Sequence, residues 1–326
     1  MEKIFITGGA GYVGSKLVPK LLDLGNKVTV LDLMIYGEDV LPDNKNLNKV
    51  KGDIRDTELL KKILPGHHAL IHLACILNDP SYELNPTLGK SINYDAFEPL
   101  VKISREQNVN RFIYASSSSV YGVKKEKNVT EDMSLEPLTD YSKFKGRCEK
   151  ILNSYKSDDF ITTTIRPSTV CGYAKRQRLD LVVNILTNHA FFKKKITVFG
   201  GSQLRPNIHI EDMVDSYISV LNADHKKING EIFNVGFKNQ SVNELAEDVR
   251  EIIGSNVEII NSKSDDNRSY HVSSKKISDI LNFNTKFTIK DAVSDLQSAF
   301  KNKLLINTFE DENYFNIKRM QSIKLK

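Results

Sequence analysis

A glycine-rich turn near the start of the chain constrains the fold more than any other sequence feature. The run TGGAGYVG at 7–14 joins a β-branched stretch at 3–7 to a stretch with helical periodicity. Gly8 permits a tight turn, Gly11 lets the backbone approach a pyrophosphate, and Gly14 allows close contact between the helix and the strand. The N-terminus of the helix offers free N–H groups and a positive dipole end. The turn therefore predicts an anion-binding strand–helix unit.

The alternation of short apolar runs with helical stretches continues to residue 166 and predicts an α/β fold. We expect a Rossmann doubly wound parallel sheet with helices on both faces, plus a smaller α/β C-terminal substrate lobe. The pattern changes after Arg166-Pro167. The expected nucleotide-binding domain is 1–166, with 207–235 returning to it, and the expected substrate lobe comprises 167–206 and 236–326.

Composition and patterning exclude several classes of protein. The chain has 326 residues, of which 40% are hydrophobic and 27% charged, without low-complexity bias. No apolar stretch is long enough for a signal peptide or a membrane span, so we expect a cytoplasmic protein that contacts no membrane. The net charge of +5 is scattered, which predicts no nucleic-acid partner. The three cysteines show no CxxC spacing, so neither disulfides nor a metal site are expected.

Acidic residues after the second and third predicted strands indicate which dinucleotide binds. Asp32 ends the strand at 27–32, eighteen residues after Gly14. A carboxylate there can accept both hydroxyls of an adenosine ribose and repels a 2′-phosphate, which favours NAD over NADP. Asp53 and Ile54 follow the third strand, and the topology predicts that they lie at the rim where an adenine would bind.

A tyrosine and a lysine with helical spacing carry the candidate chemistry. Tyr141 and Lys145 lie four residues apart in a predicted helix at 140–155, and a serine run at 116–119 precedes them. Alone, such a pair is more often a surface pair. With the glycine turn and Asp32, it predicts that a hydroxyl, a phenol and an ammonium converge. A tyrosine with a pKa of about 10 must lose roughly three pKa units to act as a base near neutral pH, and Lys145 and an oxidised nicotinamide ring both favour the phenolate.

With these residues assembled, the chain resembles the extended short-chain dehydrogenase/reductases, in particular the nucleotide-sugar epimerase/dehydratase group with its UDP-glucose 4-epimerase-like members. The resemblance covers most of the chain, up to about residue 300. The motifs that carry it are TGGAGYVG at 7–14, Asp32, GDI at 52–54, HLA at 72–74, Asn93 in SINYDA, SSSSVYG at 116–122, YSKFK at 141–145, RPSTVCG at 166–172 and RPNIHIEDMV at 205–214.

The resemblance implies roles for individual residues. Tyr141 would be the base, Lys145 would hold the nicotinamide ribose and lower the pKa of the tyrosine, and Ser117 would hydrogen-bond the reacting hydroxyl. The implied cofactor-binding residues are Gly8, Gly11, Tyr12, Val13, Gly14, Asp32, Asp53, Ile54, Leu73, Ala74, Asn93, Ala115, Ser116, Tyr141, Lys145 and Pro167. The implied substrate-binding residues are Asn78, Ser118, Thr169, Arg178, Arg205 and Arg268.

Departures from the family motifs narrow the expected reaction. Sugar 4,6-dehydratases of the family have Asp-Glu where this chain has Ser118-Ser119, so dehydration is disfavoured. Family reductases that consume NADPH usually have a basic residue where this chain has Asp32. The expected function is therefore NAD-dependent epimerisation of a nucleotide-diphosphate sugar at C4 through a transient 4-keto intermediate. The alternatives are a nucleotide-sugar 4-dehydrogenase that releases the keto sugar and a non-catalytic NAD-binding scaffold.

The identity of the substrate and the assembly of the chain stay open on these grounds. Thr169 stands where family 4-epimerases commonly have an asparagine that contacts the nucleotide diphosphate. The stretch at 176–180 resembles one found in members that act on modified or seven-carbon GDP sugars. The resemblance also implies a homodimer joined through the predicted helices at 94–107 and 140–155. His209 lies on a predicted alternating strand, where we expect it to be a hydrogen-bonded structural residue.

Overall fold

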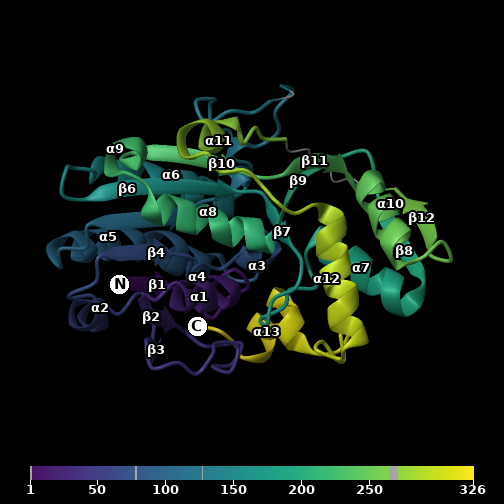
Figure 1. Ribbon diagram of the computed structural model, residues 1–326, viewed down its shortest axis with the longest axis horizontal. Coiled ribbons are helices and arrows are strands. Elements are labelled where there is room, and N and C mark those ends of the chain that lie inside the picture. Colours follow the sequence, from purple (N-terminus) through teal and green to yellow (C-terminus); the bar gives the residue numbers. More distant parts are fainter. Residues whose placement is uncertain (1, 78, 127, 264–270) are drawn as a thin grey trace.

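One large parallel sheet organises the molecule. The computed structural model describes residues 2–77, 79–126, 128–263 and 271–326 (Figure 1). Seven strands lie in the order β10-β6-β5-β4-β1-β2-β3, and every neighbouring pair is parallel. The direction of winding reverses between β1 and β4, which is where ligands bind in sheets of this kind. The strands are β1 (Lys3–Thr7), β2 (Lys27–Asp32), β3 (Leu47–Lys51), β4 (Ala69–His72), β5 (Arg111–Ala115), β6 (Ile161–Pro167) and β10 (Glu231–Val235).

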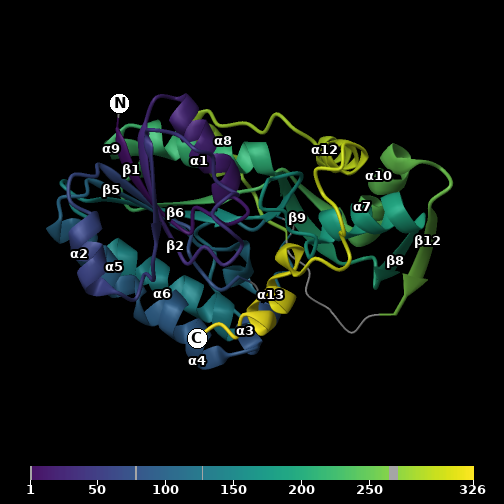
Figure 2. The same ribbon diagram turned by 90° about the horizontal axis from the view of Figure 1, so that it is seen from below.

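Helices cover both faces of this sheet (Figure 2). Alternate residues of β1 enter two different cores: Ile4 and Ile6 pack on the side of α1 and α8, and Phe5 packs on the side of α2, α5 and α6. A strand that is buried on both faces is expected to have a continuous apolar run, and β1 has one from Ile4 to Ile6. The predicted doubly wound Rossmann fold is confirmed. These helices are α1 (Gly14–Asp23), α8 (Ile210–Asn222), α2 (Thr57–Ile63), α5 (Phe97–Glu106) and α6 (Asp140–Ser154).

A second lobe lies beyond the carboxyl ends of the strands (Figure 1). Its core is formed by three helices packed together with a two-stranded parallel sheet, β12-β8. A three-stranded sheet, β11-β9-β7, lies between the two parts. Residues 207–209 therefore belong to the three-stranded sheet. In contrast, β10 belongs to the seven-stranded sheet, and α8 packs on that sheet. The elements are α7 (Val182–Lys193), α10 (Val242–Ile253), α12 (Ile289–Lys301), β7 (Thr169–Cys171), β8 (Lys195–Phe199), β9 (Leu204–His209), β11 (Lys238–Ser241) and β12 (Glu258–Ser262).

Several short helices complete the structure. The predicted helix at 94–107 is interrupted: a π-helical turn at Ser91–Asp95 precedes α5, which begins only at Phe97. The segment after residue 302 has only weak hydrophobic periodicity, yet it includes a helix, α13, whose Met320 packs into the core on one face of the large sheet. No helix in the described ranges is both long enough and apolar enough to cross a membrane. The remaining elements are α3 (Asp79–Glu83), α4 (Pro86–Lys90), α9 (His225–Ile228), α11 (Lys275–Leu281) and α13 (Asn316–Ser322), with 3-10 turns at Ser118–Tyr121 and Glu312–Tyr314.

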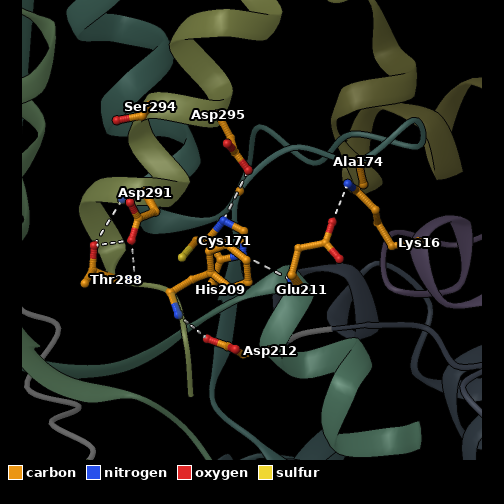
Figure 3. Close-up of polar contacts among 12 residues, drawn as sticks. Lys16, Cys171, Ala174, His209, Glu211, Asp212, Thr288, Asp291, Ser294 and Asp295 are labelled. Carbon is orange, nitrogen blue, oxygen red and sulfur yellow. Dashed lines mark hydrogen bonds and ion pairs between the residues drawn. The ribbon is translucent and has the colours of Figure 1, made fainter. Parts of the chain in front are cut away.

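His209 joins the large layer to the second lobe (Figure 3). Its Nδ1 accepts the backbone N–H of Glu211 at 3.1 Å, its Nε2 lies 3.3 Å from the carboxylate of Asp295 on α12, and its ring stacks on Phe287. Asp212 accepts the backbone N–H groups of Lys286 and Phe287. His209 is thus the hydrogen-bonded structural residue expected from the sequence. In the described part of the chain, no group of three or more His, Cys, Asp or Glu side chains could hold a metal ion.

Candidate active site

Two adjoining cavities open at the carboxyl ends of the parallel strands. The larger has a volume of about 420 Å³ and the smaller a volume of about 130 Å³. Gly8, Gly11 and Tyr12 of the glycine turn line both cavities, as does Leu73 immediately after β4. Doubly wound sheets bind ligands in the crevice where the direction of winding reverses. The two cavities therefore form one candidate site, with the glycine turn between its halves.

The glycine turn requires its glycines. Gly8 has a φ of +74°, and a Cβ atom on it would lie 2.5 Å from the backbone nitrogen of Ala74. A Cβ atom on Gly14 would collide with the carbonyl oxygen of Gly9. Gly14 thus permits close packing within the turn itself, not against a strand as the sequence suggests. The small residues leave room for a phosphate to approach the backbone at the start of α1.

The smaller cavity contains the predicted recognition site for an adenosine ribose. Asp32 at the end of β2 accepts the backbone N–H of Ala10 at 3.0 Å and that of Met34 at 2.8 Å. Burial raises the pKa of Asp32, while those two hydrogen bonds and the charge of Arg176 oppose the shift. Each carboxylate oxygen can accept a further hydrogen bond. Asp53 also lines this cavity, and it forms an ion pair of 2.6 Å with Arg55.

Tyr141 and Lys145 lie on the buried side of α6, in the wall of the larger cavity. Thr139 and Ser142 form a reciprocal capping box, which starts the helix immediately before Tyr141. Residues four apart share a helix face, so both side chains project in one direction. Lys145 Nζ donates a 2.6 Å hydrogen bond to the carbonyl oxygen of Ala115 and lies 6.0 Å from the centre of the Tyr141 ring.

Ser117 brings a hydroxyl to the same cavity from the end of β5. Its Oγ accepts the backbone N–H of Ser119 at 3.1 Å and so caps the short 3-10 turn at Ser118–Tyr121. A hydrogen bond of 2.8 Å also joins the Oγ atoms of Ser117 and Ser119. Ser117 lies close enough to Tyr141 to lower the pKa of the phenol. The structure therefore places all three predicted catalytic side chains in one cavity.

The pKa of Tyr141 is raised, whereas the nearby charge of Lys145 was expected to lower it. Burial is the largest cause and raises the pKa of Tyr141 well above its ordinary value, and Cys75 and Asp79 add to this effect. The nearby hydroxyl of Ser117 and the charge of Arg178 act in the other direction. The side chains alone thus keep the phenol protonated near neutral pH. Formation of the phenolate depends on positive charge brought in with the ligands.

Two predicted substrate arginines lie in the wall of the larger cavity. Arg178 is buried, its Nε donates a 2.9 Å hydrogen bond to Asp180, and its Nη2 atom has no hydrogen-bond partner in the described part of the chain. Arg205 donates from Nη1 to the carbonyl oxygen of Leu204. A buried guanidinium nitrogen without an acceptor suits an anionic group such as a diphosphate, which accepts paired hydrogen bonds from arginine.

Most of the predicted site residues line the two cavities. Those in the larger cavity are Gly8, Gly11, Tyr12, Val13, Gly14, Leu73, Ala115, Ser116, Ser117, Ser118, Tyr141, Lys145, Pro167, Thr169, Arg178 and Arg205. Those in the smaller cavity, besides the residues lining both, are Asp32, Asp53, Ile54 and Ala74. Asn78 and Arg268 lie outside the described residues.

One residue differs from its predicted placement. Asn93 lines neither cavity; its side chain accepts the N–H of Ile76 at 2.8 Å and donates to the carbonyl oxygen of Ile76 at 2.9 Å. It therefore holds the loop after β4 and is a positioning residue. Tyr12 does line both cavities, and its hydroxyl donates to the carbonyl oxygen of Gly172 at 2.6 Å, so the polar end of this side chain points toward the segment after β7.

Comparison with known proteins decides the family. Residues 4–236 match the profile of the NAD dependent epimerase/dehydratase family. The chain belongs to this family. It is accordingly an NAD-dependent enzyme of the extended short-chain dehydrogenase/reductase type, as its sequence motifs predict.

Curated relatives in the epimerase/dehydratase family have different named reactions. The UDP-glucose 4-epimerase of Lactobacillus helveticus is 30% identical over 271 residues, covering 77% of this chain and 82% of the relative. UDP-glucuronic acid decarboxylase 1 of Arabidopsis thaliana is 27% identical over 319 residues, covering 93% and 71%. The dTDP-glucose 4,6-dehydratase of Streptomyces niveus is 23% identical over 312 residues, covering 89% and 90%. Family membership alone therefore leaves the type of reaction open.

Solved structures of the family have the same fold. The UDP-glucose 4-epimerase of Thermotoga maritima, solved with UDP-glucose, superposes with a TM-score of 0.84 at 24% identity and covers 93% of this chain and 100% of that one. MoeE5, solved in complex with UDP-glucuronic acid and NAD, superposes with a TM-score of 0.80 at 25% identity and covers 92% and 99%. The cavities described above fit NAD, because the cradle at Gly8 admits no Cβ atom and Asp32 lies in the smaller cavity.

A buried ion pair supports the site of this epimerase/dehydratase-family chain and was not predicted. Glu149 lies one helical turn beyond Lys145, and its carboxylate accepts hydrogen bonds from Arg166 at 3.0 and 2.7 Å and from Ser116 at 2.5 Å. Both charged side chains are only 3% exposed. The sequence feature that could have identified Glu149 is its spacing of four residues from Lys145, which places the two residues on one helix face.

Further unpredicted residues line the smaller cavity. Arg176 comes from the loop before α7, and Asn316, Met320 and Leu325 come from the last part of the chain. In the sequence these residues lie far from the glycine turn and form no motif with it. Only the tertiary fold brings them beside Asp32, so local patterning could not identify them.

Proposed function

We propose that this chain catalyses the NAD-dependent epimerisation of a nucleotide-diphosphate sugar at C4 through a transient 4-keto sugar. The observation that carries the proposal is the convergence of Ser117, Tyr141 and Lys145 in one cavity that adjoins the predicted dinucleotide site. The relative with 30% identity is a UDP-glucose 4-epimerase, which agrees with this reading.

The side chains divide the proposed chemistry between them. Tyr141 accepts the proton of the C4 hydroxyl and later returns it, once positive charge brought in with the ligands has lowered the pKa of its phenol. Ser117, in the same cavity, hydrogen-bonds the reacting hydroxyl and orients it toward the phenol. The charge of Lys145, held by the carbonyl of Ala115, favours the phenolate. NAD, when bound, supplies reversible hydride transfer.

The serines beside Ser117 support epimerisation over dehydration. Ser118 and Ser119 stand where the family's dehydratases have Asp-Glu, and the Oγ of Ser119 is hydrogen-bonded to that of Ser117. A neutral hydroxyl is a poor acid and base near pH 7 compared with a carboxyl group whose pKa is tuned. Elimination of water therefore lacks the expected groups at these two positions.

The diphosphate of the substrate has a matching environment in the larger cavity. Arg178 and Arg205 both lie in the cavity wall, and the Nη2 atom of Arg178 has no hydrogen-bond partner among the residues that the structure describes. Arg178 also lowers the pKa of Tyr141, so its charge acts on the reacting centre. We propose that these arginines hold the diphosphate, with Ser118 and Thr169 in contact with the substrate.

A panel of UDP-, GDP-, CDP- and dTDP-sugars, incubated with the purified enzyme and NAD, tests the function. Products are resolved by proton NMR while absorbance is followed at 340 nm. The proposal requires interconversion of one sugar with its C4 epimer without net NADH. Stoichiometric NADH with a 4-keto product would establish a 4-dehydrogenase instead. A chain that turns over no sugar, and whose biological activity survives Tyr141→Phe, would be a binding scaffold.

We also propose that the chain forms a homodimer through α5 and α6. The proposal follows the family resemblance, and the two helices do lie side by side on one face of the sheet. Light scattering during gel filtration measures the mass directly. A monomer of 36.9 kDa at micromolar concentration would refute this assembly.

A further inference from the structure

The last part of the chain forms one wall of the smaller cavity. Asp32, Asp53 and Ile54 come from the strand ends of the large sheet, and Met320 and Leu325 lie across the same cavity from the C-terminal segment. Figure 1 shows this segment in yellow, running from α12 through α13 back toward the large sheet. We call residues 312–326 the C-terminal cover.

Polar contacts fasten the C-terminal cover to the sheet side of the cavity. The hydroxyl of Tyr36 donates to Asn316 Oδ1 at 2.9 Å, and Arg319 Nε donates to the carbonyl oxygen of Ile35 at 2.6 Å. At the far end, Arg55 Nη2 donates to the carbonyl oxygen of Lys326 at 2.9 Å. Three separate points therefore hold the cover over the loop that follows β2 and over the residues that follow β3.

Arg176 links the cover to the ribose end of the cavity. Its guanidinium lies 3.6 Å from the centre of the Tyr36 ring, and its Nη2 donates to Asn316 Oδ1 at 2.5 Å. The side chain is 3% exposed, yet its Nε has no hydrogen-bond partner in the described part of the chain. A buried donor without an acceptor is costly unless a ligand supplies the acceptor. Asp32 beside it would accept the ribose hydroxyls, so an acceptor of the same nucleoside moiety suits Arg176.

The apolar side chains of the cover suit a flat aromatic base. Met320 is 8% exposed, and it belongs to the same apolar cluster as Ile54 and Ile92 from the sheet side. A methionine thioether and aliphatic side chains pack well against the faces of an aromatic ring. An adenine that enters the smaller cavity would thus meet apolar groups from the sheet side and from the cover, and its burial would favour a slow release.

We propose that the C-terminal cover and Arg176 form the outer wall of the adenosine subsite and retain the dinucleotide through the catalytic cycle. The inference rests on the proposed function, because an epimerase must keep the reduced cofactor in place between oxidation and reduction of one sugar. Retention by the adenosine half leaves the nicotinamide half free to face the sugar. Met320, Leu325 and Arg176 are thereby assigned as binding residues for the nucleoside.

The test compares a double variant with a matched control. Met320→Ala combined with Leu325→Ala removes both apolar contacts, and Gln321→Ala changes an exposed residue on the same helix. The release of NADH from the full-length protein is followed by stopped-flow fluorescence, and the dissociation constants of ADP-ribose and nicotinamide mononucleotide are measured by calorimetry. In the double variant we expect the rate constant of NADH release and the dissociation constant of ADP-ribose to increase by about tenfold to a hundredfold. The Gln321→Ala variant should keep the native values of both quantities. The dissociation constant of nicotinamide mononucleotide should stay the same in the double variant.

The outcomes separate this inference from the proposed function. If the folded double variant, checked by circular dichroism, releases NADH and binds ADP-ribose like the Gln321→Ala protein, the cover plays no part in retention. If nicotinamide mononucleotide binding weakens equally, the loss is a general distortion and the assignment is wrong. Faster NADH release in a protein that epimerises no sugar would support the cover and refute the epimerase proposal. Arg176→Gln gives a second measurement, since it should weaken ADP-ribose and leave nicotinamide mononucleotide unaffected.

Discussion

The Oγ of Ser116 donates a hydrogen bond of 2.5 Å to the carboxylate of Glu149, one helical turn beyond Lys145 on α6. This bond joins the helix that carries Tyr141 and Lys145 to the segment that carries Ser117. The same carboxylate pairs with Arg166 on β6. The buried Glu149–Arg166 pair thus helps to fix the positions of Ser117, Tyr141 and Lys145 relative to one another.

We expect Glu149→Gln to lower the free energy of unfolding by about 3–5 kcal/mol, because it leaves the buried Arg166 without its counter-charge. Urea denaturation measures the loss. The double variant Glu149→Gln, Arg166→Met is the control, since it removes both charges and should recover much of the stability. A single variant as stable as the native protein would show that the pair contributes nothing.

We expect Tyr141→Phe to reduce kcat by about a hundredfold to ten-thousandfold while the dissociation constant of NAD changes little, because the phenol oxygen is the proposed proton acceptor. Kinetics on the active sugar and calorimetry with NAD give the two values. Asp158→Ala, at an exposed position beyond the C-terminal end of α6, is the control. Retention of full activity by the Phe variant would remove Tyr141 from the mechanism.

We expect Gly8→Ala to abolish NAD binding and to destabilise the fold, because the new Cβ atom would lie 2.5 Å from the backbone nitrogen of Ala74 and the residue has a φ of +74°. Gly25→Ala separates the two causes. Gly25 has a φ of +83° but has open space around its Cβ position, so its variant should lose only about 1 kcal/mol. Equal losses in the two variants would show that the contact with Ala74 is unimportant.

Acid should destabilise the protein through His72 as the pH falls. Burial, aided by the charge of Lys145, lowers the pKa of His72 from 6.5 to about 3. Between these values the unfolded chain binds a proton that the folded protein does not, so stability is lost as the pH falls from about 6.5 to about 3 at up to about 1.4 kcal/mol per pH unit. Unfolding free energies measured between pH 4 and 8 should fall less steeply for His72→Asn. Parallel curves would contradict the assignment to His72.

Sequence patterning predicted the parts of the site whose determinants are local. The glycine turn, the strand end at Asp32 and the spacing of Tyr141 and Lys145 each depend on a few neighbouring residues, and the structure places them at one crevice. The parallel, doubly wound character of the large sheet was also predicted, from the repeated strand–helix rhythm, whereas the order of its strands was not.

The remaining features depend on tertiary packing. The upward pKa shift of Tyr141 comes from burial and from Cys75 and Asp79, which belong to other elements. Asn93 has the sequence context of a cofactor residue, but the fold turns its amide toward Ile76. Met320 reaches the smaller cavity only because the chain returns from the second lobe. A one-dimensional pattern contains no information on these distances.

The position of β10 has a consequence for biogenesis. β10 (Glu231–Val235) pairs with β6 (Ile161–Pro167), and the intervening stretch includes α7, β8 and β9 of the second lobe and its linking sheet. During synthesis on the ribosome, the backbone edge of β6 therefore stays unpaired until residue 235 has emerged. An unpaired strand edge presents free backbone N–H and C=O groups and is a template for association with other chains. Nascent chains halted inside this stretch should be the ones that aggregate or engage chaperones.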